Sequence, residues 1–203
     1  MNDTDQELEV KFYLSKRKEM EERLIARGAI LKDPRILEIN LRFDTPDLSL
    51  FNTGRILRLR LDKRARMTYK AMGRIEGGVN LRQELEFTVS NFDTARSVLE
   101  ALGYEVYLMY EKFRTTFMLG DLEVVLDELP YGDFLEIEGP NPASIQMAAQ
   151  KLDLNWDARI LYSYTVLFEQ ARARLGFDFR DLSFENFKGI NVTPDVLGVL
   201  IAD

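Results

Sequence analysis

Alternation of apolar and polar residues predicts a chain dominated by β-strands. Eight segments alternate with a period of two residues, at 6–13, 36–43, 55–62, 66–72, 80–89, 105–118, 121–128 and 134–138. Turn-forming stretches separate several of them, such as Asp44-Thr45-Pro46-Asp47 and Leu129-Pro130-Tyr131-Gly132. A series of hairpins of this kind is typical of an antiparallel sheet or barrel.

Four further segments have helical spacing, at about 16–27, 91–102, 143–151 and 157–174. We expect Ser15 to cap the first of these helices, and Asn91 or Asp93 to cap the second. The segment Met72–Gly78 contains three glycines and is expected to form a loop. Strands and helices together predict an α+β fold.

Length and composition exclude several classes of function. The 203 residues suffice for one domain, expected at 1–175, with a C-terminal tail at 176–203 that docks on it. The absence of cysteine and histidine excludes disulfides, thiolate nucleophiles, Ser-His-Asp triads and histidine-ligated metals. The net charge of −7 argues against a general binder of nucleic-acid polymers. Because the sequence shows neither a secretory signal nor a membrane-length apolar run, we expect a cytoplasmic protein with no membrane partner.

One face of the predicted strands carries charges that are sorted by sign. Five strands each place two like charges two residues apart, at Glu7/Glu9, Arg58/Arg60, Glu84/Glu86, Lys112/Arg114 and Glu136/Glu138. Side chains at this spacing share a face about 7 Å apart and repel each other. Any one such strand is ordinarily a solvated sheet face. A surface that serves only solubility mixes acidic and basic residues, however, so the sorting of charges by strand favours a binding or catalytic site.

The whole charged face has seven acidic and seven basic residues. The acids are Glu7, Glu9, Glu84, Glu86, Asp127, Glu136 and Glu138, and the bases are Lys11, Arg58, Arg60, Lys70, Arg82, Lys112 and Arg114. If the sheet curls with this face inward, it encloses a charged tunnel, and helices 16–27, 91–102 and 157–174 could cover the outward apolar face. Carboxylates favour a hard divalent cation, and Arg and Lys favour phosphate oxygens. A metal-bound polyphosphate meets both requirements.

Short motifs occur in a fixed order along these strands. They are Glu7-Leu8-Glu9-Val10-Lys11, Phe43-Asp44-Thr45-Pro46, Ile56–Arg60, Tyr69-Lys70-Ala71, Arg82–Glu86, Lys112-Phe113-Arg114, Leu126-Asp127, Gly132–Glu138 and Ser163-Tyr164. In this order they closely resemble the motifs of the CYTH superfamily, also called triphosphate tunnel metalloenzymes. Two positions depart from the family pattern, since Phe43 stands where Tyr is usual and Ala71 where Gly is usual. The resemblance covers about 6–170 and leaves the tail out.

The resemblance implies an eight-stranded antiparallel tunnel with a charged interior and flanking helices. It implies one or two Mg²⁺ or Mn²⁺ ions held by Glu7, Glu9, Asp127, Glu136 and Glu138. Glu84 and Glu86 would either join these ligands or order the basic residues across the tunnel. The triphosphate would be bound by Lys11, Arg58, Arg60, Lys70, Arg82, Lys112 and Arg114, and the catalytic residues would be Glu7, Glu9, Lys11 and Asp127.

The resemblance also implies an enzyme that acts on a small-molecule triphosphate. The first hypothesis is a triphosphatase, a phosphoric anhydride hydrolase acting on inorganic tripolyphosphate or a small organic triphosphate. The second is a class IV adenylyl cyclase that converts ATP to cyclic AMP and pyrophosphate. A non-catalytic polyphosphate- or nucleotide-binding module and a solvated barrel without a site are the remaining alternatives. The tail phenylalanines are expected to dock on the body, with closure of the tunnel mouth or a homodimer contact as alternatives.

Overall fold

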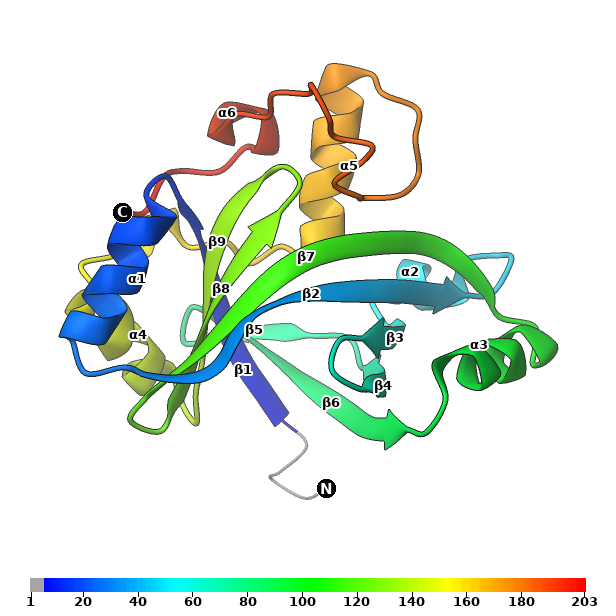
Figure 1. The fold of residues 1–203 in the computed structure, drawn as a ribbon, viewed down its shortest axis with the longest axis horizontal. Coiled ribbons are helices and arrows are strands. Elements are labelled where there is room, and N and C mark those ends of the chain that lie inside the picture. Colours follow the sequence, from blue (N-terminus) through cyan, green and yellow to red (C-terminus); the bar gives the residue numbers. More distant parts are fainter. Residues whose placement is uncertain (1–5) are drawn as a thin grey trace.

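The computed structural model describes residues 6–203, which form one sheet flanked by helices (Figure 1). Within this range the strands are β1 (Gln6–Leu14), β2 (Ile30–Asp44), β3 (Ile56–Leu61), β4 (Ala65–Lys70), β5 (Arg74–Glu76), β6 (Val79–Val89), β7 (Glu105–Leu119), β8 (Leu122–Leu129) and β9 (Gly132–Glu138). The helices are α1 (Arg17–Ala26), α2 (Ser49–Asn52), α3 (Phe92–Ala101), α4 (Pro142–Lys151), α5 (Tyr164–Leu175) and α6 (Pro194–Leu197), with a 3-10 turn, η2, at Trp156–Ala158. None of these helices is long and apolar enough to cross a membrane.

The sheet closes into a ring because β1 has a partner on each of its edges. Residues Glu9–Leu14 pair with β9, and Gln6–Glu9 pair with β6. The order around the ring is β1-β9-β8-β7-β2-β3-β4-β6, with every pairing antiparallel, while β5 pairs only with β6. This arrangement confirms the predicted α+β fold with an antiparallel tunnel.

Two strand predictions need correction. β2 begins at Ile30 rather than near residue 36, and it continues past Pro34, where the register with β7 shifts between Asp33 and Ile36. Such an irregularity accommodates proline, which cannot donate a ladder hydrogen bond. The loop expected at 72–78 contains the short strand β5, which makes a hairpin with the start of β6.

Two helix predictions were wrong at their starts. The last long helix begins at Tyr164 rather than near residue 157, because Ile160 is extended and bridges Lys11 of β1. Ser163 then caps α5 by accepting a hydrogen bond from the Val166 amide. Ser15 does not cap α1, since its amide and hydroxyl both donate to the Asp203 carboxylate. The predicted cap at Asn91 is confirmed.

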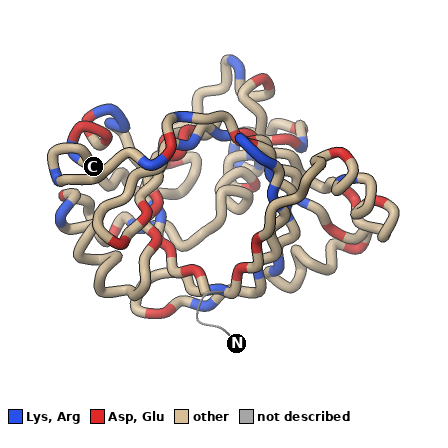
Figure 2. Tube along the Cα trace, turned by 60° about the horizontal axis from the view of Figure 1, so that its bottom comes forward, with Lys and Arg blue, Asp and Glu red and all other residues tan. Residues whose placement is uncertain are grey.

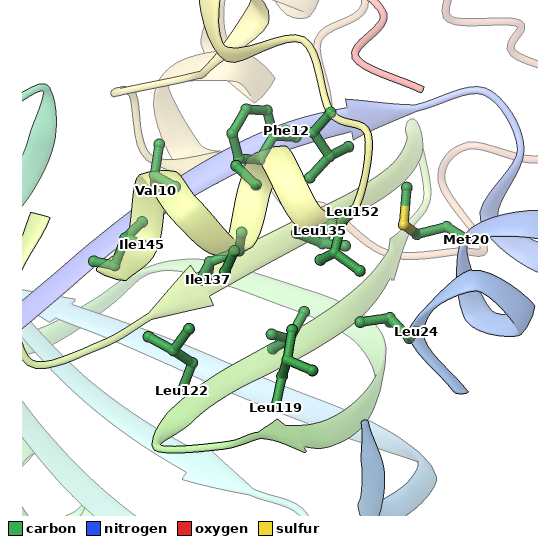
Figure 3. Close-up of a cluster of buried hydrophobic side chains, with 14 of the residues drawn as sticks. Val10, Phe12, Met20, Leu24, Leu119, Leu122, Leu135, Ile137, Ile145 and Leu152 are labelled. Atoms are coloured by element: carbon green, nitrogen blue, oxygen red, sulfur yellow. The ribbon is translucent and has the colours of Figure 1, made fainter. Parts of the chain in front are cut away.

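Two helices, α1 and α4, cover the outward apolar face of β1, β7, β8 and β9 (Figure 3). Met20 and Leu24 of α1 and Ile145 of α4 meet Phe12 and Ile137 there, and all five side chains are buried. Burial of each large apolar side chain contributes roughly 1.5–3 kcal/mol. The helix α3 covers β2 and β3 in the same way through Leu99.

The helix α5 packs against the inward face instead. Its Leu167 and Phe168 join a buried cluster with Tyr13, Tyr110 and Phe134. These three strand residues follow the same two-residue alternation as the inward charges of β1, β7 and β9. The expectation that helix 157–174 covers the outside was therefore wrong, because the inward face turns from charged to aromatic at this end and α5 closes the ring there.

The segment after α5 packs at the same end. Leu182 pairs with β7, where its amide donates to the Met109 carbonyl and its carbonyl accepts from the Glu111 amide. Farther along the segment, the Ala202 amide donates to the Tyr13 carbonyl of β1. Three phenylalanines surround Phe168 of α5, namely Phe177, Phe179 and Phe187.

Candidate active site

The ring encloses a cavity of about 550 Å³ whose lining is mostly charged. Figure 2 shows Lys, Arg, Asp and Glu along the strands that surround the opening. The lining includes all seven predicted basic residues and every predicted acidic residue except Asp127. Asp127 is fully buried within the wall and contacts two of the lining bases, Lys112 and Arg114. The fold therefore brings the fourteen residues together around one space.

Five carboxylates from β1, β8 and β9 form one side of the cavity, here called the acidic wall. They are Glu7, Glu9, Glu123, Glu136 and Glu138. Strand pairing places Glu9, Glu138 and Glu123 side by side across three strands. Burial and the charges of Glu7, Glu123 and Glu9 raise the pKa of Glu138 to about 8. Glu138 therefore holds a proton at neutral pH, which a bound cation would displace.

Asp127 is the centre of a buried ion-pair network. Its carboxylate accepts hydrogen bonds from Lys112 Nζ at 2.8 Å, Arg114 Nε at 2.6 Å and the Tyr164 hydroxyl at 2.9 Å. Arg114 also reaches Glu136, at 2.6 Å. Burial opposes ionisation of Glu136, but the charges of Lys11, Arg114 and Lys112 hold its pKa well below the usual range. The network fixes two bases, Lys112 and Arg114, in the lining of the cavity.

Two lysines lie directly against the acidic wall. Lys11 Nζ is 2.6 Å from Glu9 and 3.3 Å from Glu136, and Lys70 Nζ is 2.5 Å from Glu7 and 2.9 Å from Glu84. Burial lowers the pKa of Lys11, but Glu136, Glu9 and Glu7 more than offset burial and raise it above its ordinary value. The pKa of Lys70 is raised for the same reason, by Glu7, Glu9 and Glu84. Both lysines stay protonated and can serve as donors to an anion.

The other strands of the ring carry most of the bases, here called the basic wall. They are Arg42 of β2, Arg58 and Arg60 of β3, Lys70 of β4, and Lys112 and Arg114 of β7, of which Lys70 and Arg114 reach the acidic wall. Arg58 donates to Thr68 at 3.1 Å and to Tyr110 at 3.4 Å, and it lies 3.8 Å from Glu84 and 3.6 Å from Glu86. Burial acts to raise the pKa of Tyr110, but the charges of Arg58, Lys112 and Arg60 outweigh burial, so the pKa lies below its ordinary value. Glu84 and Glu86 therefore lie among the bases.

Strand β2 contributes residues that the sequence analysis missed. Glu38 is 2% exposed and lies 3.4 Å from Arg60 and 3.7 Å from Lys112. Burial opposes its ionisation, but Arg60 and Lys112 hold its pKa well below the usual range. Asn40 accepts a hydrogen bond from Arg60 Nε at 3.1 Å, and Arg42 follows two residues later. The sequence does place polar residues at every second position here, as Glu38-x-Asn40-x-Arg42. A search for two like charges two residues apart does not detect them, because these residues differ in charge.

The carboxylates of the acidic wall suit Mg²⁺ or Mn²⁺ as hard oxygen ligands. Between residues 6 and 203, no three of them are already gathered around one point. Glu7 and Glu9 are instead drawn toward Lys70 and Lys11, whose Nζ atoms they contact. Glu138 remains among like charges. Glu7, Glu9 and Glu138 thus fit a divalent cation in chemistry and in charge.

The fold and its motifs match known proteins. A family model described as the CYTH domain matches residues 5–161. A solved structure of a putative adenylate cyclase from Vibrio parahaemolyticus has a TM-score of 0.72 and 22% identity, covering 80% of this chain and 97% of that one. The PH1012 protein from Pyrococcus horikoshii has a TM-score of 0.66 and 24% identity, covering 78% and 96%.

A third similar structure is a putative adenylyl cyclase from Hippeastrum, described as revealing a dominant triphosphatase activity. Its TM-score is 0.59 at 16% identity, with 85% of this chain and 97% of that chain covered. At these identities the structural similarity establishes the fold alone. No curated protein sequence matches the chain.

Proposed function

The chain belongs to the CYTH domain family. On this basis we propose that it is a divalent-metal-dependent enzyme that acts on the triphosphate group of a small molecule. The favoured reaction is hydrolysis of inorganic tripolyphosphate or a small organic triphosphate. One observation carries the proposal: each of two candidate metal ligands is ion-paired with a candidate phosphate ligand, Glu7 with Lys70 and Glu9 with Lys11.

This pairing explains how a metal-bound triphosphate would enter without leaving buried charges unpaired. Glu7 and Glu9 would exchange a lysine for the metal, and Lys70 and Lys11 would exchange a carboxylate for phosphate oxygens. Because removing one partner of a buried pair is strongly unfavourable, metal and phosphate should bind together. Neither the carboxylates nor the lysines would then be left without a partner of opposite charge.

Glu7, Glu9 and Glu138 are the proposed ligands of Mg²⁺ or Mn²⁺, with Glu136, on the same strand as Glu138, and Asp127 of β8 as further candidates. When bound, the ion would supply positive charge to the phosphate oxygens and promote attack at phosphorus. Asp127, held by Lys112, Arg114 and Tyr164, is proposed to fix those two bases. Glu84 and Glu86 are proposed to order Lys70 and Arg58, since they lie beside them.

The basic residues are proposed to bind the triphosphate. They are Lys11, Arg58, Arg60, Lys70, Arg82, Lys112 and Arg114. Their donors are buried or half-buried, and fixed donors in such a site stabilise developing negative charge more strongly than water does. Glu7, Glu9, Lys11 and Asp127 are the proposed catalytic set, with Lys11 acting as a permanently charged donor.

Adenylyl cyclase activity of class IV is the second candidate. Two of the three similar structures described above carry a cyclase name. Tyr162 lines the cavity and is 57% exposed, so it offers a ring on which a nucleobase can stack. In this reaction the ribose 3′-hydroxyl attacks the α-phosphorus and pyrophosphate leaves.

Phosphorus NMR tests the two reactions side by side. The protein is incubated with Mg²⁺, and then with Mn²⁺, together with either tripolyphosphate or ATP. Conversion of tripolyphosphate to phosphate and pyrophosphate supports the hydrolase, whereas conversion of ATP to cyclic AMP and pyrophosphate supports the cyclase. Tight binding without turnover of tripolyphosphate, ATP or thiamine triphosphate would contradict an enzymatic role and leave a binding module.

A further inference from the structure

The second half of β6 forms an open edge of the sheet. Along one edge β6 pairs with β5 and then with β4. On its other edge it pairs with β1, and only through Asn80–Gln83. Within residues 6–203, no strand lies beside Glu84–Val89 on that second edge. Figure 1 shows this part of β6 running away from β1 toward α3.

The hydrogen bonds of the paired edge identify the backbone groups that face the open one. The Ala71 amide donates to the Gln83 carbonyl, on the side of β4. Successive residues of a strand direct their N–H and C=O groups to opposite edges, so Glu84, Glu86 and Thr88 direct theirs toward the open edge. Such a row of donors and acceptors is a template for another strand.

The outward side chains of this open edge are apolar. Leu85 is 44% exposed and Phe87 is 58% exposed, although both lie within a strand. Val89 and, on the neighbouring β4, Met67 continue the apolar face and are half-buried. Exposed edges in natural proteins are often protected by lysine or proline, and the segment 84–89 contains neither. The edge therefore combines free backbone groups with an apolar face that burial would stabilise.

A second copy of the chain offers the same edge in return. Two β6 strands can run antiparallel about a two-fold axis, with one residue opposite its own copy at the axis. If that residue is Glu86, two carboxylates lie opposite each other, and if it is Leu85, Glu84 lies opposite Glu86. These acids face into the ring beside Lys70 and Arg58, but like charges directly opposite each other are still destabilising.

A register centred on Phe87 avoids both conflicts. It sets the two Phe87 side chains opposite each other, Leu85 opposite Val89 and Glu86 opposite Thr88. The last pair also joins backbone groups that face the open edge. Moving the axis to Thr88 would leave only 87–89 of the strand in the overlap. The register centred on Phe87 therefore gives the longest pairing without opposed acids.

We propose that two copies of the chain associate through the open edges of β6, antiparallel and centred on Phe87, so that their rings share one continuous sheet. Each Glu86 amide donates to the Thr88 carbonyl of the second copy, and each Thr88 amide donates to its Glu86 carbonyl. Because the pairing uses both open edges, assembly stops at a dimer. This inference concerns an interface and does not depend on the proposed function.

Sedimentation velocity over a series of protein concentrations tests the dimer. It compares the full-length parent with Phe87→Glu, and uses Phe51→Glu as the matched control, because Phe51 is 48% exposed but lies on α2. The parent and Phe51→Glu should shift from monomer to dimer over the same concentrations. Phe87→Glu places two carboxylates at the axis and should weaken self-association about 100-fold, as for loss of a central interface residue.

A second variant, Thr88→Pro, tests the backbone pairing without adding charge. The Thr88 amide faces the open edge, so proline removes no hydrogen bond to β4 and should leave the melting temperature of the dilute protein unchanged. Self-association should again be lost. Hydrogen exchange should show the Glu86 and Thr88 amides protected in the concentrated parent but not in Phe87→Glu.

Three results would overturn the interface. The first is a parent that stays monomeric at every concentration, and the second is a dimer that persists in both Phe87→Glu and Thr88→Pro. The third is protection of the Glu86 and Thr88 amides in a monomer, which would assign the edge to another part of the same chain, such as residues 1–5, which lie outside the described range.

Discussion

Glu138 and Arg42 are in opposite electrostatic situations on opposite sides of one cavity. Glu138 lies beside Glu7, Glu9 and Glu123, and its pKa is raised to about 8. Arg42 lies beside Arg58 and Arg82, and its pKa is lowered. Burial contributes to both shifts, and like charges add to it. In each case the described residues place like charges, and no ion-paired counter-charge, beside the group.

Between Glu138 and Arg42, the buried carboxylates of the cavity are paired with nearby bases. Asp127, Glu136 and Glu38 each lie near at least two bases, and the pKa values of Glu136 and Glu38 are lowered. The contrast shows that the cavity is not uniformly charged: its middle is paired, while Glu138 and Arg42 each lie among like charges. A divalent cation would favour the ionised form of Glu138, and phosphate oxygens would supply the counter-charge that Arg42 lacks.

The largest expected effect comes from weakening the acidic wall. Glu9→Gln removes one proposed metal ligand and frees Lys11 from its 2.6 Å partner. We expect turnover of the triphosphate substrate to fall about 10³-fold at saturating Mg²⁺, comparable with loss of a main electrostatic contact. Steady-state kinetics measure the fall. Glu22→Gln, on the exposed face of α1, is the control and should keep parent activity. Parent-like turnover in Glu9→Gln would rule out the acidic wall as the metal site.

The paired middle should respond in stability. Asp127→Asn removes the charge that Lys112 and Arg114 share at 2.8 and 2.5 Å. Because this leaves two buried cations with fewer partners, we expect the free energy of unfolding to fall by about 3 kcal/mol. Denaturant titration measures the change. The double variant Asp127→Asn with Lys112→Met should recover part of the lost stability. A loss in the double variant equal to the sum of the losses in the two single variants would argue against direct coupling of Asp127 and Lys112.

The closed end can be tested through the tail. We propose that residues 176–203 are an integral part of the wall beside β7, since Leu182 is fully buried there. Leu182→Ala should lower the unfolding free energy by about 2–4 kcal/mol, as for other buried leucines. Leu200→Ala is the matched control, because Leu200 is 62% exposed and should change stability by less than about 0.5 kcal/mol. Equal, small effects in denaturant titrations would indicate a tail that is not docked.

The smallest effect concerns pH. With a pKa of about 8 in the folded state, Glu138 keeps its proton where the unfolded chain, with an ordinary value of 4.5, has lost it. Folding is then linked to proton uptake, so the melting temperature of metal-free protein should fall as pH rises from 5 to 8. Asp133, whose pKa burial also raises, acts in the same direction at lower pH. Glu138→Gln should flatten the slope, and an unchanged slope would remove Glu138 as its source.

The strand pattern was sufficient to predict most of the tunnel. Alternation located each of the eight ring strands, and like charges two residues apart identified pairs such as Arg58/Arg60 that do line the cavity. These features are local, because strand geometry alone decides which side chains share a face. The predicted roles of these residues remain predictions.

Features that depend on long-range packing were missed. Glu38 and Arg42 belong to a strand whose inward residues differ in sign, so their importance appears only when β3 and β7 are placed beside them. Glu123 looks like a surface residue paired with Lys32 until register sets it beside Glu138. The side on which α5 packs depends on where the inward face becomes aromatic. No short window of sequence contains that information.

The most direct test is a crystal structure of the protein with Mn²⁺ and an imido-bridged triphosphate that resists hydrolysis. The account predicts an anomalous Mn²⁺ signal within bonding distance of at least two of Glu7, Glu9 and Glu138. It also predicts phosphate oxygens on Lys11 and Lys70, whose carboxylate contacts would be broken. A triphosphate bound outside the ring, or one inside it with Glu7–Lys70 and Glu9–Lys11 still paired, would contradict the account.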